Sequence, residues 1–560
     1  MKISGKAISQ FFFREAFENG TWRCNKCKKV KRSPKGYTNL VTHARTCFGK
    51  DFDQEAVAHL ERHGFHVKDD GTIVGGEVDQ RVIDSFYVSN EKEKRAHKWI
   101  KWIACRNQAL TEVENELTQD LANVKGMSSK TLRKYIIATA AETVPSISKA
   151  LKDSGAVTLL FDGWSCDGAS THYVGIFAGY INSEGEYEEV LLAMQPTLDE
   201  EDLGADSHIE LLESTLEMYD LDDDHILCLI GDNCATNRAI ATKMGLALIG
   251  CANHRLNLAV NTYIQSKPGL KDAIAKVGTL MGKASTLKNA ARLRDLTMER
   301  YGKYILAKKG NETRWTSDFA MTKRYLVLEK EFQELTSLDE HQLTARETRL
   351  IKMASEHFTV FESVAVEIQG KGMDLLFVRE QFDALLANPE YAVMAKYLAP
   401  DADIVLNPAF ESGIINIALG KPLSTEEEAA CRRLRRKIPE TTVEVEEEDT
   451  DTLSTLQLLE RNRKRRKLSS NSPHAVEYYD VGKLICATSN CCERLFSEAK
   501  YIMVPHRRCM SPLVFESLLF LKKNLQFWNI KTVAMAMQRA EKEDSEDEEL
   551  FARDSDYFYH

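Results

Sequence analysis

The stretch VTLLFDGWS at residues 157–165 marks the point at which helical periodicity gives way to strand-like sequence. Its first five residues, VTLLF, are apolar apart from the β-branched Thr158, which is typical of a strand buried on both faces. The stretch continues into Asp162 and Gly163, a polar and turn-forming pair that favours the end of a strand. We therefore predict a buried strand over 157–161 that ends at a carboxylate.

The segments that follow predict the rest of a sheet. Apolar runs predict further strands at 173–181, 189–194, 226–230 and 246–249. NSEG (182–185) has the composition of a turn between the second and third strands. Helical patterns follow the third, fourth and fifth strands. Three successive strands, a helix, a strand, a helix and a strand is the order of a ribonuclease-H-like sheet, so we predict an α/β fold with a mixed sheet of that type.

Two longer segments are helical by pattern. From about 91 to 152, apolar residues recur at spacings of three to four, and Met127-Ser128-Ser129 predicts a helix start. Residues 270–440 are helical throughout, with few Gly or Pro breaks. Residues 51–90 contain turn signals and predict a linker.

Composition excludes several classes of protein. The chain has 560 residues, 43% hydrophobic and 28% charged, which predicts three to four domains and argues against wholesale disorder. No apolar run approaches the roughly 18–20 residues of a membrane span, and no signal-peptide pattern is present. The 13 cysteines fall in no disulfide-like array, which favours a reducing compartment with buried thiols and a metal site.

Charge is distributed unevenly along the chain. Residues 1–50 hold twelve Lys or Arg and two Glu, a net charge of +10; because the whole chain carries −10, the other 510 residues carry −20. A basic N-terminal segment on an otherwise acidic chain predicts that this segment, and not the whole surface, binds a polyanion. Six basic residues lie close together in this head: Lys26, Lys28, Lys29, Lys31, Arg32 and Lys35.

The same head contains metal-type ligands at regular spacing. Cys24, Cys27, His43 and Cys47 form a C-x2-C-x15-H-x3-C pattern, which can close a tetrahedron around zinc. A helix that begins near Thr38 would put His43 and Cys47 on one face. Because the segment is too short and polar to bury a core, we predict that zinc supplies its folding energy. The alternative is a chance cluster of these residues on a basic tail.

Three carboxylates form a candidate catalytic site. Asp162 and Asp232 each follow an apolar run, and neighbouring strand ends would bring them together, where they would repel unless a divalent cation were held between them. Glu493 would come from a helix beside the sheet. Such ligands suit magnesium or manganese, and two of these ions serve phosphoryl transfer. The alternative for each aspartate is a turn or a helix cap, and composition alone, with 84 acidic residues, does not select this trio.

Five motifs supply the context that selects these acids. They are FDGWS (161–165), LIGDNCATN (229–237), CANHRLNLAV (251–260), TRWTS (313–317) and CCERLFSEAK (491–500). In this order they resemble the hAT superfamily of cut-and-paste DNA transposases, which are DDE enzymes, over about residues 95–530. The cysteine pattern of the head, with aromatic residues ahead of it, resembles a BED-type zinc finger. Two departures are Cys491-Cys492, where serines are common in the family, and a short helical insertion.

The resemblance implies roles for individual residues. It makes Asp162, Asp232 and Glu493 the catalytic acids, with an all-α insertion before Glu493. It implies that Trp315 stacks on a flipped base, the alternative being a helix-packing anchor. Cys251 and His254 match the C-x2-H motif and are interpreted as local support for the active site. The BED-type resemblance implies that the finger grips DNA phosphates through Lys28, Lys29, Lys31, Arg32 and Lys35, the alternative being a knuckle used for protein contact.

These inferences divide the chain into six segments. The segments are a BED-like finger (1–50), a linker and helical DNA-binding or dimerisation region (51–150), the first part of the ribonuclease-H-like domain (151–312), the helical insertion with a basic and acidic linker (313–470), the last part with the hAT C-terminal dimerisation region (471–530), and an acidic tail (531–560). Apolar residues at 514–525 serve dimerisation, the monomer's core, or both. RNRKRRK (461–467) resembles a nuclear localisation signal, the alternative being a solvated linker.

The function that the sequence predicts is therefore that of a nuclear enzyme on double-stranded DNA. It would nick DNA at terminal repeats and join the excised ends to a target, as a dimer or higher oligomer, with zinc and magnesium or manganese but no small-molecule cofactor and no membrane. The alternative is a domesticated regulator that keeps the finger but no longer cuts DNA. A third interpretation, another ribonuclease-H-like nuclease, is disfavoured by the TRWTS and CERLFS motifs.

Overall fold

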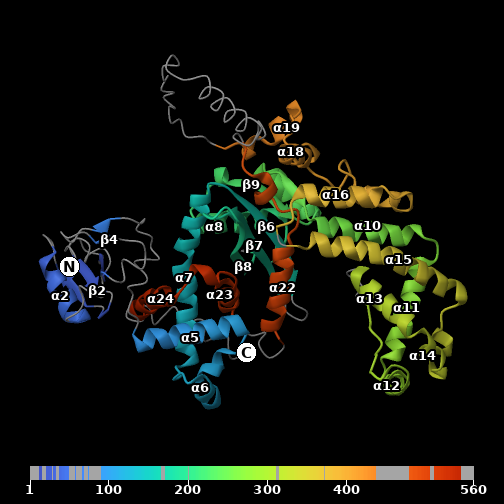
Figure 1. Cartoon of the computed structure of the whole chain (residues 1–560), viewed down its shortest axis with the longest axis horizontal. Coiled ribbons are helices and arrows are strands. Elements are labelled where there is room, and N and C mark those ends of the chain that lie inside the picture. The colour runs from blue at the N-terminus through green and yellow to red at the C-terminus, as the bar shows by residue number, and fades with distance from the viewer. Residues whose placement is uncertain are drawn as a thin grey trace, which may run out of the picture. The chain divides into compact units, whose positions relative to one another are not determined.

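The computed structural model describes most of the chain. The described residues are 12–15, 21–24, 26–27, 29–32, 37–49, 57, 66–67, 73–74, 90–165, 171–197, 199, 201–310, 315–370, 372–436, 478–504 and 510–543. The chain forms two compact units, of which the first comprises Met1–Ser146 with Val504–His560 and the second Ile147–Met503. Figure 1 labels their helices and strands.

The second unit contains a five-stranded mixed sheet. Its strands are β6 (Val157–Ser165), β7 (His172–Ile181), β8 (Tyr187–Pro196), β9 (Ile226–Gly231) and β10 (Leu248–Gly250). The order across the sheet is β10-β9-β6-β7-β8. Strands β6, β7 and β8 pair antiparallel, whereas β9 pairs parallel with β6 and β10 parallel with β9. The five strands predicted from the sequence are confirmed.

Strand β6 is longer than predicted. It pairs with β7 from Val157, opposite Tyr180, to Ser165, opposite His172, so the hydrogen-bonded ladder extends beyond the apolar run. Asp162 therefore lies inside a strand and not at its end. The prediction that a polar and turn-forming pair ends the strand was wrong here, because pairing with a long neighbour outweighs local turn preference.

Helices cover the sheet and connect its strands. They are α8 (Ala205–Met218), α9 (Ala235–Met244), α10 (Ala252–Ser266) and α22 (Asn490–Ile502). Helix α22 packs on β6 and β7 although it lies more than 300 residues further along the chain (Figure 1). A short helix, α21 (Val481–Leu484), precedes it.

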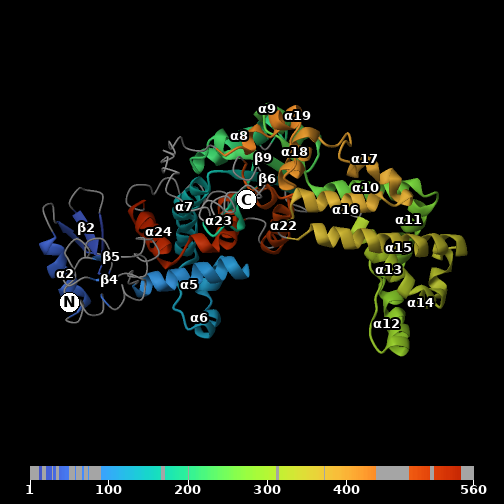
Figure 2. The ribbon, with the colours of Figure 1, turned by 45° about the horizontal axis from the view of Figure 1, so that its top comes forward.

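Within residues 270–440, the described part of the chain is mostly helical, as predicted. Its α-helices are α11 (Leu270–Ala284), α12 (Leu287–Tyr301), α13 (Trp315–Val327), α14 (Glu329–Gln333), α15 (Ala345–Ile368), α16 (Leu375–Leu386), α17 (Ala395–Leu398), α18 (Pro408–Ala418) and α19 (Thr425–Ala430). Helices α11, α13 and α15 pack against one another, and α15 also contacts α10 (Figure 2). Buried aromatic rings fill the space between them, among them Phe319, Phe358 and Phe361.

The first unit begins with a small antiparallel sheet followed by a helix. The strands are β1 (Phe13–Glu15), β2 (Thr21–Cys24) and β3 (Val30–Arg32), and the helix is α2 (Thr38–Phe48). The predicted helix start near Thr38 is confirmed. A two-stranded pair, β4 (His66–Val67) and β5 (Ile73–Val74), lies further along the chain.

The helices of the first unit come from both ends of the chain. They are α5 (Glu91–Arg106), α6 (Glu116–Ala122), α7 (Ser129–Ser154, which continues past the unit boundary), α23 (Pro512–Lys523) and α24 (Ile530–Glu543). Helices α23 and α24 pack on α5, where Trp99, Ile100 and Ile103 are buried. The chain from Val504 thus belongs to the same compact unit as the N-terminal helices, and α23 and α24 bury the apolar face of α5.

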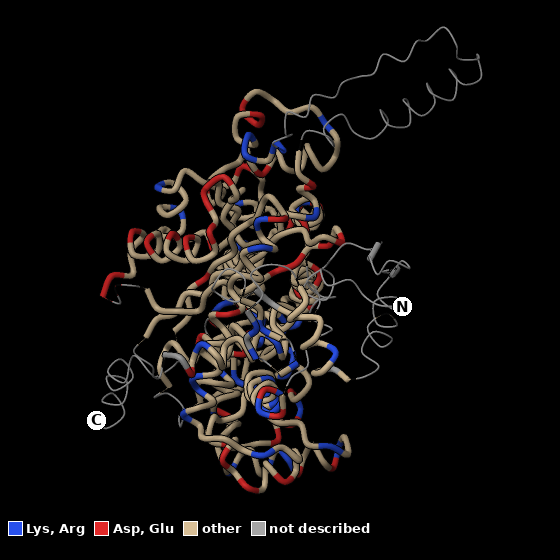
Figure 3. The backbone as a smooth tube through the Cα atoms, turned by 90° about the vertical axis from the view of Figure 1, so that its left-hand side faces the viewer, with Lys and Arg blue, Asp and Glu red and all other residues tan. Residues whose placement is uncertain are grey.

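Several predicted features lie outside the described residues. These are the acidic stretch 444–451, the basic run 461–467, most of the linker 51–90 and the tail beyond 543. Within the described chain, acidic and basic residues are both widely spread (Figure 3). None of the helices in that part is long and apolar enough to cross a membrane.

Candidate functional site

Four side chains of the first unit bring metal-type ligand atoms together, and we call them the Cys/His cluster. Cys24 ends β2, and its N–H donates to the Lys29 carbonyl at 3.1 Å, which closes the turn that carries Cys27. His43 and Cys47 lie one turn apart on α2. Cys27 Sγ lies 3.2 Å from His43 Nε2, and all four ligand atoms lie within 4.8 Å of one another. The cluster could bind a metal ion such as zinc.

The electrostatics of the cluster fit such an ion. Burial raises the pKa of the Cys24 thiol to about 12, so a neighbouring cation is what would favour its thiolate. Burial, with repulsion from Lys31 and Lys29, lowers the pKa of His43 and keeps the imidazole neutral, which is the form that binds metal. The Phe13 ring packs edge-on against His43, with centroids 5.9 Å apart.

The basic residues predicted to bind DNA are described in part. Lys29 is exposed and Lys31, on β3, is half-buried. The backbone of Arg32 ends β3. Lys28 and Lys35 lie outside the described residues.

In the second unit, sheet pairing brings the first two predicted acids side by side. Strands β6 and β9 are parallel, and Leu160 pairs with Ile230. Asp162 lies two residues after Leu160, inside β6, and Asp232 lies two residues after Ile230, just past the end of β9. The two acids therefore occupy neighbouring positions. Both side chains are half-buried.

Glu493 reaches this place from the first turn of α22. The approach of α22 depends on Gly175, which pairs with Asp162 across β6 and β7. A Cβ atom at Gly175 would lie 3.2 Å from side-chain atoms of both Leu495 and Phe496, tighter than ordinary contact. Glycine at this position therefore lets α22 lie directly on the strand beside Asp162.

The three acids act on one another electrostatically. Burial raises the pKa of Asp162 to about 7, and repulsion from Asp232 and Glu493 adds to the shift. The carboxylate oxygens of the three acids nevertheless lie further apart than the ligand atoms of the Cys/His cluster. Among the described residues, that cluster is the only group of three or more possible metal ligands whose ligand atoms all lie within 4.8 Å of one another.

Cys251 and His254, the two residues of the C-x2-H motif, contact the chain at and next to Asp232. His254, on the first turn of α10, places Nδ1 3.0 Å from Asp232 Oδ2, and this hydrogen bond raises the pKa of His254. The Cys251 N–H donates to the Gly231 carbonyl at 2.7 Å. Burial raises the pKa of the Cys251 thiol to about 11. Cys251 thus holds α10 against the end of β9, and His254 holds the carboxylate.

Two asparagines that brace the Asp232 loop had no role in the sequence-based prediction. Asn237 Nδ2 donates to the Asp232 carbonyl at 2.9 Å, and Asn233 Nδ2 donates to the Ile404 carbonyl at 3.0 Å. Asn233 lies against Gly250, where a Cβ atom would come within 2.0 Å of its Oδ1. The available signal was LIGDNCATN itself, in which both asparagines follow the aspartate.

A cavity of about 270 Å³ lies beside the acids and is lined in part by Asp232, His254, Glu493 and Trp315. Trp315 is 3% exposed, and its ring lies 6.1–6.4 Å from three phenylalanine rings: Phe319, Phe358 and Phe361. These contacts are those of a helix-packing anchor in the cavity wall. Stacking on a base would require the indole to leave this aromatic cluster.

Replacing Asp162 by asparagine is expected to stabilise the metal-free protein at pH 8. The pKa of Asp162 is about 7 in the folded protein against an ordinary 3.8, so between these values the folded state binds more protons than the unfolded state. The free energy of unfolding therefore falls as pH rises from about 4 to about 7. Because the carboxylate is only half-buried, we expect the variant to gain about 1–3 kcal/mol at pH 8 and nothing at pH 4. Urea denaturation at both pH values, with EDTA present, measures the difference, and a gain of equal size at both would contradict the prediction.

No protein-family model matches the chain, and a search of curated proteins finds no similar one. The structure itself defines a mixed α/β protein with one five-stranded mixed sheet. Near its N-terminus the Cys/His cluster could hold a metal such as zinc.

Proposed function

We propose that the chain is a DNA-binding transposase of the hAT type, which cleaves DNA at terminal repeats and transfers the ends by metal-dependent phosphoryl transfer. It would act in the nucleus as a dimer or higher oligomer. The observation that carries the proposal is the convergence of Asp162, Asp232 and Glu493, from three distant segments, on one site where burial and mutual repulsion raise the pKa of Asp162. Carboxylates gathered in this way are the arrangement expected of a divalent-metal site.

The sheet supports the finer fold assignment. Three antiparallel strands, followed by a fourth strand parallel to the first and a fifth parallel to the fourth, agree with the ribonuclease-H-like order predicted from the sequence. The helices from α13 to α19, which lie within residues 313–470, would belong to the insertion that interrupts this domain before Glu493.

The geometry of the acid site suggests a role for each of its residues in metal-dependent cleavage. Asp162, Asp232 and Glu493 would hold magnesium or manganese, which prefer oxygen ligands. When bound, such ions would activate water or a 3′-hydroxyl and stabilise the leaving oxygen. His254 would orient the Asp232 carboxylate through its hydrogen bond. Asn237 holds the loop that presents the carboxylate.

A basic groove in the first unit supports DNA binding outside the finger. A cavity of about 370 Å³ between the start of α5 and the 123–125 loop is lined by one acid and five basic residues: Glu91, Lys92, Lys94, Arg95, Lys98 and Lys125. Lys92 pairs with Glu541 and Lys94 with Glu91. No ion pair joins the other three basic side chains to another described residue. Unpaired cations in a groove are suited to a phosphate backbone.

Reversing two of these charges, in a Lys98→Glu and Lys125→Glu double variant, is expected to weaken duplex DNA binding more than about tenfold at low salt. The plot of log affinity against log salt concentration should also become less steep by about 1–2, because roughly 0.9 counterions are released for each phosphate neutralised. Fluorescence anisotropy at several salt concentrations measures both quantities. The matched control is Lys271→Glu with Lys288→Glu, which reverses two exposed charges elsewhere. Equal losses in the two double variants would show that net charge alone is responsible.

The second candidate is a DNA-binding regulator without cleavage activity. One observation favours it. The carboxylate oxygens of the three acids do not all lie within 4.8 Å of one another, whereas the ligand atoms of the Cys/His cluster do. Manganese-dependent cleavage of DNA that carries the flanking terminal repeats separates the two. Specific nicks support the transposase, whereas tight, zinc-dependent binding without nicks supports the regulator. A protein that shows no DNA binding and no cleavage would contradict both candidate functions.

A further inference from the structure

The last helix of the first unit brings the end of the described chain to the basic groove beside the start of α5. Helix α24 ends at Glu543, and Glu541 in its last turn pairs with Lys92, a residue that lines the groove. Glu541 Oε1 lies 2.5 Å from Lys92 Nζ and accepts a hydrogen bond from the Tyr135 hydroxyl at 3.2 Å. The chain therefore continues into residues 544–560 from a point beside the groove.

Helix α24 is held in this position by the rest of the unit. Its residues Val533, Ala536 and Met537 are buried, and the helix packs on α5, which forms one wall of the groove. Arg539 of α24 also pairs with Glu142 of α7 at 3.4 Å. The starting point of the segment that follows α24 is thus set by the fold.

Residues 544–560 carry a charge that is complementary to the groove. They include seven acidic residues and one basic residue, a net charge of −6, whereas the groove is lined by five basic residues and one acid. Its four lysines are exposed, so their ammonium groups are open to a ligand: Lys92, Lys94, Lys98 and Lys125. Opposite charges on a segment and on a neighbouring exposed groove favour their association.

The segment is also long enough to lie along the groove. Residues 544–560, when extended, span about 55–60 Å. The groove follows α5 from Lys92 to Lys98, a rise of about 9 Å. Because the segment starts beside Lys92, its acidic residues can reach Lys98 and Lys125 while α24 stays in place. A tether this short also gives the segment an effective concentration in the millimolar range at the groove.

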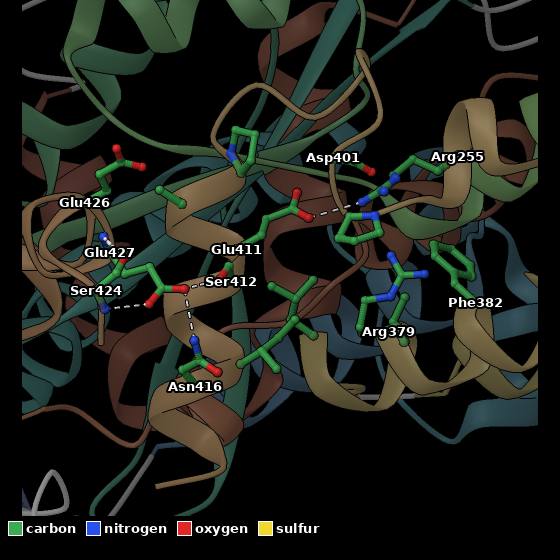
Figure 4. Close-up of a pocket in the computed structure, with 16 residues that line it drawn as sticks. Arg255, Arg379, Phe382, Asp401, Glu411, Ser412, Asn416, Ser424, Glu426 and Glu427 are labelled. Carbon is green, nitrogen blue, oxygen red and sulfur yellow. Dashed lines mark hydrogen bonds and ion pairs between the residues drawn. The ribbon is translucent and has the colours of Figure 1, made fainter. Parts of the chain in front are cut away.

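A larger cavity, of about 410 Å³, has the opposite charge. It lies among α10, α16, α18 and α19 of the second unit (Figure 4), and its lining includes four acidic residues: Asp401, Glu411, Glu426 and Glu427. The two arginines of this lining are already paired, Arg255 with Glu411 at 3.2 Å and Arg379 with Asp383 at 2.7 Å. Such a lining repels an acidic segment, so charge favours the basic groove over this cavity.

We propose that residues 544–560 bind in the basic groove of their own chain and compete there with DNA phosphates. Their carboxylates would pair with Lys98 and Lys125, as Glu541 pairs with Lys92. The segment would thereby act as an internal inhibitor of DNA binding. The docking is argued from charge and position alone, whereas its consequence for DNA rests on the proposed function.

Binding of a fluorescein-labelled peptide with the sequence of residues 544–560 tests the docking without DNA. We compare the wild type with a full-length amide variant, in which the seven acidic residues of the segment are replaced by Asn or Gln. The amide variant should bind the peptide at least about tenfold more tightly, because in the wild type the tethered segment competes for the groove. Equal binding by the two proteins, or no peptide binding to either at millimolar concentration, would overturn the proposal.

Charge reversal in the groove locates the peptide. Lys98→Glu with Lys125→Glu, added to the amide variant, should weaken peptide binding at least about tenfold. Lys271→Glu with Lys288→Glu, which reverses two exposed charges elsewhere, should leave it unchanged. Equal losses in the two would trace the binding to net charge and would overturn the proposal.

Duplex DNA binding by the amide variant measures the inhibition. The variant should bind DNA at least about fivefold more tightly than the wild type at low salt, and the gain should shrink as salt screens the groove. The control is a full-length variant in which the six acidic residues of 444–451 are replaced by amides. It should bind as the wild type does, and a gain equal to that of the amide variant would overturn the inhibition.

The two readouts separate this inference from the proposed function. If the peptide binds as expected but neither full-length protein binds DNA, the docking stands and the proposed function fails. If both proteins bind DNA with equal affinity and the peptide does not bind, the docking fails and the proposed function stands.

Discussion

Asparagine in place of Asp232 is expected to reduce manganese-dependent DNA cleavage by at least about 10³-fold, the scale of loss seen when one member of a catalytic unit is removed. The structure explains why the effect should be chemical and not a failure to fold. Asparagine has nearly the same volume, and its oxygen can still accept the hydrogen bond from His254 Nδ1 that now spans 3.0 Å. It removes the negative charge that would share a divalent ion with Asp162 and Glu493.

Cleavage of a radiolabelled duplex that carries terminal repeats, followed over time, measures this loss. The control is Asp153→Asn, the same substitution at an exposed position on α7, which should cleave at the wild-type rate. The Asp232→Asn protein should also bind the duplex with unchanged affinity, since the finger and the basic groove are untouched. Wild-type cleavage rates in the variant would exclude Asp232 from the catalytic site.

Loss of the metal from the Cys/His cluster is the second large effect that we expect. Serine in place of Cys24 removes a ligand whose Sγ lies 3.9 Å from that of Cys47. Structural zinc contributes about 10–16 kcal/mol to the folding of finger peptides, far more than so short a segment gains by burying its few apolar residues. The variant should therefore lose one equivalent of zinc per chain, unfold locally around α2, and bind DNA at least about tenfold more weakly.

Zinc content by mass spectrometry of the metal, together with DNA affinity, measures both consequences. Cys105→Ser is the matched control, because Cys105 is half-buried on α5 and lies outside the cluster. It should retain both zinc and affinity. A Cys24→Ser protein that keeps a full equivalent of zinc would exclude the cluster as the metal site.

The parts of the fold that depend on local pattern agree with the prediction. The Cys24 and Cys27 turn and the one-turn spacing of His43 and Cys47 on α2 involve neighbours in sequence, so spacing alone indicates which atoms meet. The apolar runs of the sheet are likewise local, and each strand falls close to its predicted range. Pairing with β7, a long-range effect, is what moved the end of β6 beyond Asp162.

For the candidate acid site, the motifs name three acids, but they do not indicate the residues that hold these acids in place. Motifs select Asp162, Asp232 and Glu493 without saying how far apart they lie. The close approach of α22 depends on Gly175, and the Asp232 loop depends on Asn233 fitting against Gly250. Neither fit is visible in the motifs, because each involves one small residue meeting a side chain from a distant segment. The indole of Trp315, for which stacking and packing were both open, lies within its aromatic cluster.

The sequence by itself indicated the five strands of the mixed sheet, the ligands of the Cys/His cluster, and the basic N-terminal segment that precedes an acidic chain. It could do so because periodicity, ligand spacing and charge are properties of short stretches. The tertiary structure alone decided that α23 and α24 cover α5 and that Leu160 is in register with Ile230. These outcomes depend on contacts between segments hundreds of residues apart, where burial of whole apolar faces outweighs any local preference.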